Sequence, residues 1–132
     1  MLISAARLVA VIADRLDPIA PPPFRVRAQG TDLAIDHPQS WGFTMDAGWI
    51  EDETETRTPA ELADLIIGNA LSGLQDAVSE SSKEPWPQIS PTIMALPNTR
   101  TDGERVFFWY GPSESTAVLG FPPIMLKDVT RP

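Results

Sequence analysis

The chain has 132 residues, a net charge of −8 and no cysteine. This length is typical of one domain, and an apolar content of 42% is sufficient for a buried core, which excludes global disorder. The acidic charge argues against nucleic acid and anionic membranes as partners, and the lack of cysteine excludes disulfides and thiolate metal sites.

The first predicted element is an amphipathic helix over residues 2–16, where apolar residues recur at helical spacing until Pro18 ends it. Leu8 and Val11 widen its apolar stripe, so we expect this helix to touch two surfaces. Arg7 interrupts the apolar run, which is also too short to span a bilayer. We therefore expect no signal peptide here and a cytoplasmic protein.

Alternation with a period of two then predicts three strands. Residues 24–29 and 33–35 form a hairpin across the turn residues 30–32. Residues 41–49 form a half-buried strand with one apolar face. The residues of that face are Trp41, Phe43, Met45, Ala47 and Trp49.

An acidic segment, EDETETRT, follows the third strand. Its carboxylates lack the spacing and the glycine of an EF-hand, so we expect a solvated loop and assign no metal site. The acidic residues are Glu51, Asp52, Glu53 and Glu55.

A second helix begins after this loop, where Thr58, Pro59 and Glu61 form a capping box, and it runs to about Ser79. Two internal glycines, at positions 68 and 73, each weaken this helix by about 1 kcal/mol relative to alanine. We therefore expect close packing against a neighbouring element at both glycines.

The rest of the chain predicts three more strands, at residues 92–97, 104–110 and 116–121, with turns at residues 98–103 and 111–115. The order of elements is helix, three strands, helix, three strands. This order predicts an α+β fold of two helices packed on a mostly antiparallel sheet of about six strands, as one domain over residues 1–132.

The C-terminal strands are apolar on both faces. In RVFFWYG, residues 105–111, Phe107 and Trp109 point away from the other three apolar residues. Each large apolar side chain left in water forfeits about 1.5–3 kcal/mol, so the second face needs a cover, either from the chain itself or from a partner. For the sheet as a whole we expect a partner. The expected contact residues are Trp86, Phe107, Trp109 and Val118.

No stretch of the sequence indicates catalysis. The only histidine, His37, lies in the turn-like segment DHPQ, and its neighbours Asp36 and Ser40 are adjacent in sequence without implying a catalytic triad. No glycine-rich phosphate loop follows a strand. We assign no catalytic residue and no cofactor, and expect a protein that is not an enzyme. A ligand carrier or small enzyme built on the four tryptophans remains an alternative.

The segments LQDAVSESSKEPWP, DGERVFFWYG and AVLGFPPI resemble small uncharacterised proteins of GC-rich bacteria and their tailed phages. The resemblance covers roughly the second half of the chain and includes no catalytic motif. It implies a structural role, such as a component of the phage neck or tail, and a location in the virion if the chain is phage-encoded.

Two hypotheses for the function follow. The first is a non-enzymatic structural or assembly subunit that binds other protein chains in a homo-oligomer or a hetero-assembly. The second is a soluble acidic binding module of the inhibitor, immunity or adaptor type, whose acidic segment around Glu51 to Glu55 binds a basic partner.

Overall fold

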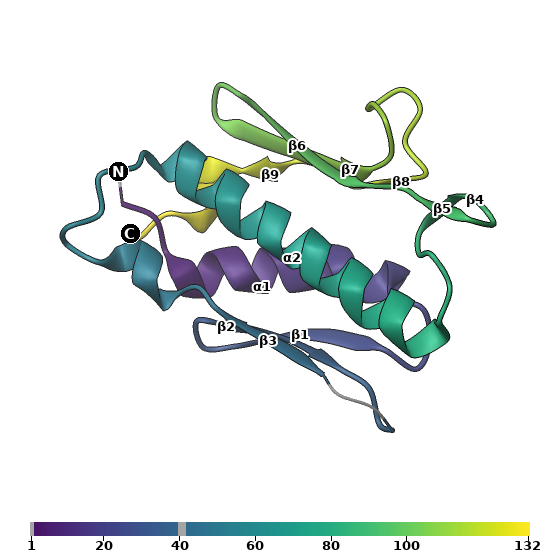
Figure 1. The fold of residues 1–132 in the computed structure, drawn as a ribbon. Helices are drawn as coiled ribbons and strands as arrows, with labels where there is room; N and C mark the ends of the chain where they lie inside the picture. Colours follow the sequence, from purple (N-terminus) through teal and green to yellow (C-terminus); the bar gives the residue numbers. More distant parts are fainter. Residues whose placement is uncertain (1, 40–41) are drawn as a thin grey trace.

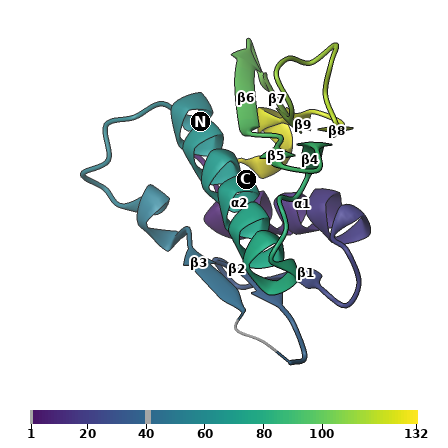
Figure 2. The ribbon, with the colours of Figure 1, turned by 45° about the vertical axis from the view of Figure 1, so that its right-hand side comes forward.

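The computed structural model describes residues 2–39 and 42–132, so Ser40 and the predicted strand residue Trp41 lie outside the described part. The fold has three layers: two helices lie between a sheet formed by the first three strands and a second sheet formed by the C-terminal strands (Figures 1 and 2). The α+β prediction is therefore confirmed. The single sheet of about six strands is not, because the strands divide into three sheets.

The helices are α1 (Ala5–Leu16) and α2 (Pro59–Ser82), with the short 3-10 helices η1 (Asp17–Ile19), η2 (Gly48–Glu51) and η3 (Leu126–Val129). The strands are β1 (Arg25–Gln29), β2 (Asp32–Asp36), β3 (Phe43–Asp46), β4 (Gln88–Ser90), β5 (Ile93–Met94), β6 (Pro97–Asp102), β7 (Arg105–Tyr110), β8 (Leu119–Gly120) and β9 (Ile124–Met125). All strand pairs are antiparallel: β1-β2-β3, the small hairpin β4-β5, and a third sheet in which β6, β8 and β9 all pair with β7.

Helix α1 begins three residues later than predicted. Ser4 caps it, since its Oγ accepts a hydrogen bond from the Arg7 backbone N–H at 3.2 Å. The residues before the cap are extended instead, and Ile3 forms an isolated β-bridge with Thr130. Residues 2–4 therefore lie beside residues 129–131, at one end of the molecule (Figure 1).

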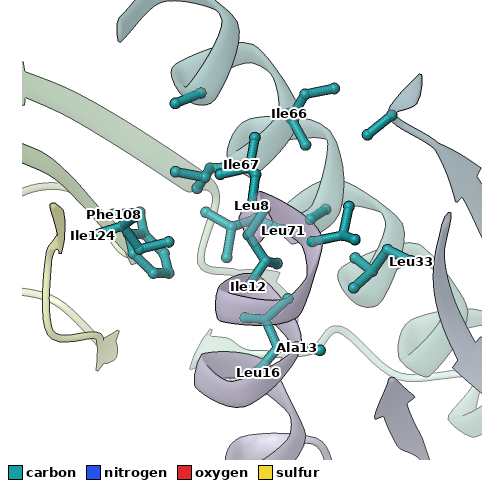
Figure 3. Packing of buried hydrophobic residues seen from close by; sticks show 14 of the residues in the cluster. Leu8, Ile12, Ala13, Leu16, Leu33, Ile66, Ile67, Leu71, Phe108 and Ile124 are labelled. Carbon is teal, nitrogen blue, oxygen red and sulfur yellow. The ribbon is translucent and has the colours of Figure 1, made fainter. Parts of the chain in front are cut away.

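The helix layer provides one continuous core for both sheets. Helix α1 packs on β1 and β2, while α2 packs on β6 and β7 and also reaches β2 and β3. In Figure 3, Leu8 and Ile12 of α1 lie beside Leu71 of α2, between Leu33 of one sheet and Phe108 of the other. The prediction that the first helix touches two surfaces is thus confirmed. Two helices are enough to cover both sheets, because each sheet has only one face turned toward the helix layer.

The third strand is shorter than predicted. It ends at Asp46, whose Oδ1 accepts hydrogen bonds from the Gly48 backbone at 2.7 Å and from the Thr31 hydroxyl at 3.4 Å. These bonds turn the chain into η2 instead of continuing the strand. As a result Trp49 leaves the strand face and is exposed, with the Arg57 guanidinium 5.9 Å from its ring centroid.

Helix α2 begins at the predicted capping box. The Thr58 hydroxyl accepts a hydrogen bond from the Glu61 backbone N–H and donates one to the Glu61 carboxylate, both at 3.2 Å. The helix continues to Ser82, three residues further than predicted, and Lys83 ends it in the left-handed conformation with φ of 59°.

The two glycines of α2 differ in their surroundings. A Cβ atom on Gly73 would lie 2.7 Å from Cζ of Phe43, so close packing is confirmed there. A Cβ atom on Gly68 would meet no other described atom within 4 Å, so the expectation of close packing at that glycine is wrong.

In the C-terminal half the predicted strand over residues 104–110 is confirmed as β7. The predicted turn at residues 98–103 is wrong: this segment is mostly β6, and the chain reverses only at Gly103, which has φ of 60°. The predicted strand at residues 116–121 is reduced to the two residues of β8. After it, Pro122 and Pro123 interrupt the pairing with β7 until β9 restores it.

Candidate protein-interaction surface

The inner face of β7 packs against α2. Val106, Phe108 and Tyr110 are buried in the common core. The Tyr110 hydroxyl donates a hydrogen bond of 2.5 Å to the backbone carbonyl of Leu71 in α2. Burial, and to a smaller extent the carboxylate of Asp76, raises the pKa of this phenol, so Tyr110 stays neutral and remains a donor.

On the outer face of β7, the same chain covers Trp109. This side chain is only 9% exposed, and its indole N–H donates to the carbonyl of Gly111 at 3.1 Å. The chain after β7 folds back beside it, so Glu114 and Ala117 line a small cavity of about 160 Å³ together with Trp109. Trp109 was predicted as a partner contact, yet it offers little free surface in the single chain.

Phe107 is half-buried under arginine side chains. The guanidinium carbons of Arg100 and Arg105 lie 4.4 and 5.1 Å from its ring centroid, within cation–π range. Arg100 also pairs with Glu114, which lowers the pKa of that carboxyl and closes the chain after β7 onto β6. The second apolar face of β7 is therefore covered largely within the chain, by a loop and by two paired arginines.

The exposed apolar side chains lie elsewhere. Of the six large apolar side chains that are exposed in the described residues, four lie between residues 89 and 118. They are Ile89 (50% exposed), Ile93 (55%), Leu96 (63%) and Val118 (41%), and we call them the hairpin surface.

The hairpin surface lies at one end of the molecule. Ile89 and Ile93 belong to the β4-β5 hairpin, which extends from the end opposite to the chain's N-terminus (Figure 1). Leu96 and Val118 flank the end of β7, since the Leu96 carbonyl accepts from Gly111 and the Val118 N–H donates to Tyr110. Of the four predicted contact residues, only Val118 belongs to this surface.

Helix α2 fixes the base of the β4-β5 hairpin. Gln75, which is buried, donates from Nε2 to the carbonyl of Ala95 at 2.6 Å. The Ser79 hydroxyl accepts from the Trp86 N–H at 3.1 Å and donates to the Trp86 carbonyl at 3.3 Å. The Trp86 ring packs edge-on against Tyr110, with centroids 5.6 Å apart. Trp86 therefore anchors the connector to its own chain, and the isoleucines beyond it stand on a fixed support.

Sequence reasoning did not identify Gln75 as an anchor. Its signal was a polar residue inside the apolar stripe of α2, four residues after Leu71 and three before Val78. A polar side chain on a buried helix face needs a hydrogen-bond partner, and here it is the backbone that leads into β6.

The predicted acidic residues line a separate groove of about 470 Å³ at the other end of the molecule. Glu51 accepts a hydrogen bond from the Ala5 N–H at 3.0 Å and pairs with Arg131 at 3.3 Å. Its carboxylate thus joins the start of α1 to the C-terminal segment, which is a structural role.

The other three acidic residues are mostly engaged in local turns. The Asp52 carboxylate accepts from the backbone and the hydroxyl of Thr54, at 2.8 and 2.7 Å, and these bonds lower its pKa. Glu55 accepts from the Arg57 N–H at 3.0 Å and pairs with its side chain. Within the described residues, Glu53 alone of the four accepts no hydrogen bond. No group of three potential metal ligands occurs in residues 2–39 and 42–132.

The remaining sequence candidates do not converge on one site. His37 Nδ1 accepts from the Gln39 N–H at 3.0 Å, and its ring packs against Phe24. The three described tryptophans, at positions 49, 86 and 109, belong to different parts of the fold. A groove of about 540 Å³ between the second half of α2 and the start of β3 contains none of these three in its lining.

Comparisons of the chain with protein-family models, with curated proteins and with solved structures find no match. In the described part of the chain, neither helix combines the length and apolarity required to cross a membrane.

Proposed function

We propose that this chain is a non-enzymatic assembly subunit that binds another protein chain through the hairpin surface. The observation that carries the proposal is the exposure of Ile89 and Ile93 on a short hairpin with a fixed base, and of Leu96 just after it. Soluble monomers seldom expose neighbouring large aliphatic side chains, and such patches are typical of protein-binding sites.

The fixed base supports this reading. The hydrogen bonds of Gln75 and Ser79 and the packing of Trp86 order the connector before any partner arrives. Binding then costs less conformational entropy than binding by a loose loop, which favours recognition by this segment. Fully burying a large apolar side chain stabilises by about 1.5–3 kcal/mol. Because the isoleucines are partly exposed, a partner that covers them gains a fraction of this free energy for each one.

A component of a phage neck or tail is the more specific form of this proposal. It is supported by the resemblance of residues 74–87, 102–111 and 117–124 to small proteins of GC-rich bacteria and their tailed phages. Two of these segments contain parts of the surface or its support: Gln75 and Trp86 in the first, and Val118 in the third.

Site-specific photo-crosslinking in the producing cell tests the proposal. A photoreactive residue is placed at position 93 and, as a control, at position 29, where Gln29 is exposed on the opposite sheet. We expect light-dependent protein adducts from position 93 and none from position 29. The proposal is wrong if position 93 gives no adduct, or if both positions give the same adducts.

A further inference from the structure

The hairpin surface lies in an electrically neutral part of the chain. Residues 85–132 carry four basic and four acidic side chains, so the entire net charge of −8 lies in residues 1–84. Residues 85–99 carry no charged side chain at all. Lys83 and Glu84, the nearest charges before this stretch, cancel each other.

In the fold, half of this charge lies on α2, whose four carboxylates and no basic side chain give −4, and the other half lies in residues 1–58. The neutral residues form the sheet around β7 and the β4-β5 hairpin, whereas β1-β2-β3 lies on the far side of the helices and the acidic loop lies at the end of the molecule near the N-terminus (Figures 1 and 2). A helix layer is about 10 Å thick, which is comparable to the Debye length of about 8 Å at physiological ionic strength. Charges of the β1-β2-β3 layer therefore act on the hairpin surface from about one Debye length or more, and the carboxylates of α2 are the nearer acidic groups.

This charge distribution bears on which partner fits. Attraction would draw a basic protein to the acidic layer, not to the neutral one. Two copies of this chain repel each other in most orientations, because each carries −8. Contact between the two neutral layers is the arrangement that keeps the acidic layers furthest apart.

We propose that a second copy of this chain covers the hairpin surface in a two-fold symmetric dimer. This inference rests on the proposed function and names the partner. A two-fold interface places the same patch on both sides, so like charges in it would oppose each other. A patch of Ile89, Ile93, Leu96 and Val118 avoids that conflict, and the nearby charges of Arg100 and Glu114 are already paired.

The small size of the surface indicates a weak dimer. The exposed parts of the four side chains amount to roughly 400 Å² per copy, about half of the ~800 Å² that a standard interface buries on each partner. Polar residues around the patch must supply the rest. We therefore expect a dissociation constant in the micromolar range, so the dimer forms and dissociates at concentrations that are easily measured.

Sedimentation equilibrium of the purified full chain, from about 1 µM to 1 mM, tests this. We expect a monomer–dimer equilibrium that strengthens or stays constant as salt is raised. The double variant Ile93→Ser, Leu96→Ser should weaken the dimer at least about 30-fold, as expected for central apolar contacts. The matched control is Leu2→Ser, because Leu2 is 60% exposed but lines the acidic groove at the other end of the molecule, and it should leave the equilibrium unchanged.

A chain that stays monomeric up to 1 mM overturns the inference, and so does equal weakening by the control substitution. The photo-crosslink at position 93 separates this failure from failure of the proposed function. An adduct with twice the mass of the chain supports the dimer. An adduct with a different protein, from a chain that is monomeric when purified, overturns the dimer and leaves the proposed function standing. The absence of any adduct overturns both.

Discussion

Glycine-to-alanine substitutions at positions 68 and 73 make a matched pair, because both lie inside α2 and differ mainly in what the added methyl group meets. Both substitutions gain helix propensity of about 1 kcal/mol. At position 68 the methyl group has free space. At position 73 it would lie 2.7 Å from Cζ and 2.9 Å from Cδ1 of Phe43, with Cε1 closer still.

These distances set the expected magnitudes. Carbon atoms pack at about 3.5–4.0 Å, so the Phe43 ring must move by roughly 1 Å to admit a methyl group. Overpacking of this kind costs about 1–3 kcal/mol, which cancels or exceeds the propensity gain. We expect Gly68→Ala to stabilise the fold by about 0.5–1 kcal/mol and Gly73→Ala to be between neutral and about 2 kcal/mol destabilising. With an unfolding entropy of about 2.1 cal/mol/K per residue, the melting temperatures of the two variants should differ by roughly 2–11 °C.

Urea and thermal unfolding of both variants measure this difference, and a double-mutant cycle with Phe43→Leu assigns its cause. The smaller leucine should relieve the clash, so Gly73→Ala should cost less in the Phe43→Leu background, with a coupling energy of at least about 1 kcal/mol. If Gly73→Ala is as stable as Gly68→Ala, or if the coupling energy is near zero, the reasoning from the Phe43 contact is refuted.

Three further predictions concern buried or clamped polar groups. Tyr110 is the only tyrosine, and its pKa is raised, so its contribution to the free energy of unfolding is complete below pH 10, the usual tyrosine pKa. Above pH 10 the wild type should lose about 1.4 kcal/mol of folding stability per pH unit, whereas Tyr110→Phe should not. Tyrosinate absorbance should appear only when the protein unfolds. Replacing Glu51 with alanine removes the acceptor of the Ala5 backbone N–H, so urea unfolding should show a free energy of unfolding lower by about 1–2 kcal/mol. The control Glu53→Ala should change it by less than about 0.5 kcal/mol. Equal effects of the two substitutions would contradict the structural role of Glu51. Asp17, whose pKa is lowered by the Arg25 side chain and by the Val26 N–H, stabilises the fold at neutral pH, and Asp17→Asn should cost about 1 kcal/mol at pH 7. This difference should shrink as pH falls below the usual carboxyl pKa and vanish below the lowered pKa, where acid titration followed by circular dichroism should show the two proteins converging.

Local signals in the sequence predicted some of the elements and missed the bounds of others. The capping box at Thr58 fixes the start of α2 because its hydrogen bonds involve only neighbouring residues. The continuous apolar run in residues 106–110 predicts β7 because a strand covered on both faces is apolar throughout. The wide apolar stripe of α1 correctly indicated a helix with two neighbours.

The division into separate sheets was not accessible from the same signals. Periodicity shows which residues share a face, but it does not show which strands pair. The cover of Trp109 depends on how residues 111–118 fold back and on the ion pair between Arg100 and Glu114, which are 14 residues apart. Such non-local contacts leave no periodic pattern in the sequence. From the sequence alone, an apolar strand face covered by the same chain therefore looks the same as one covered by a partner chain.

The helix layer has a consequence for how the protein opens. Helix α2 packs on two sheets, and within residues 2–39 and 42–132 no strand of one sheet pairs with a strand of the other. Detaching either sheet would therefore expose the same helix to water. Unfolding either sheet alone therefore has a high free-energy cost, and the protein should unfold in a single cooperative transition. Amide hydrogens in β2, α2 and β7 would then exchange with solvent at one common free energy, although they belong to three different layers.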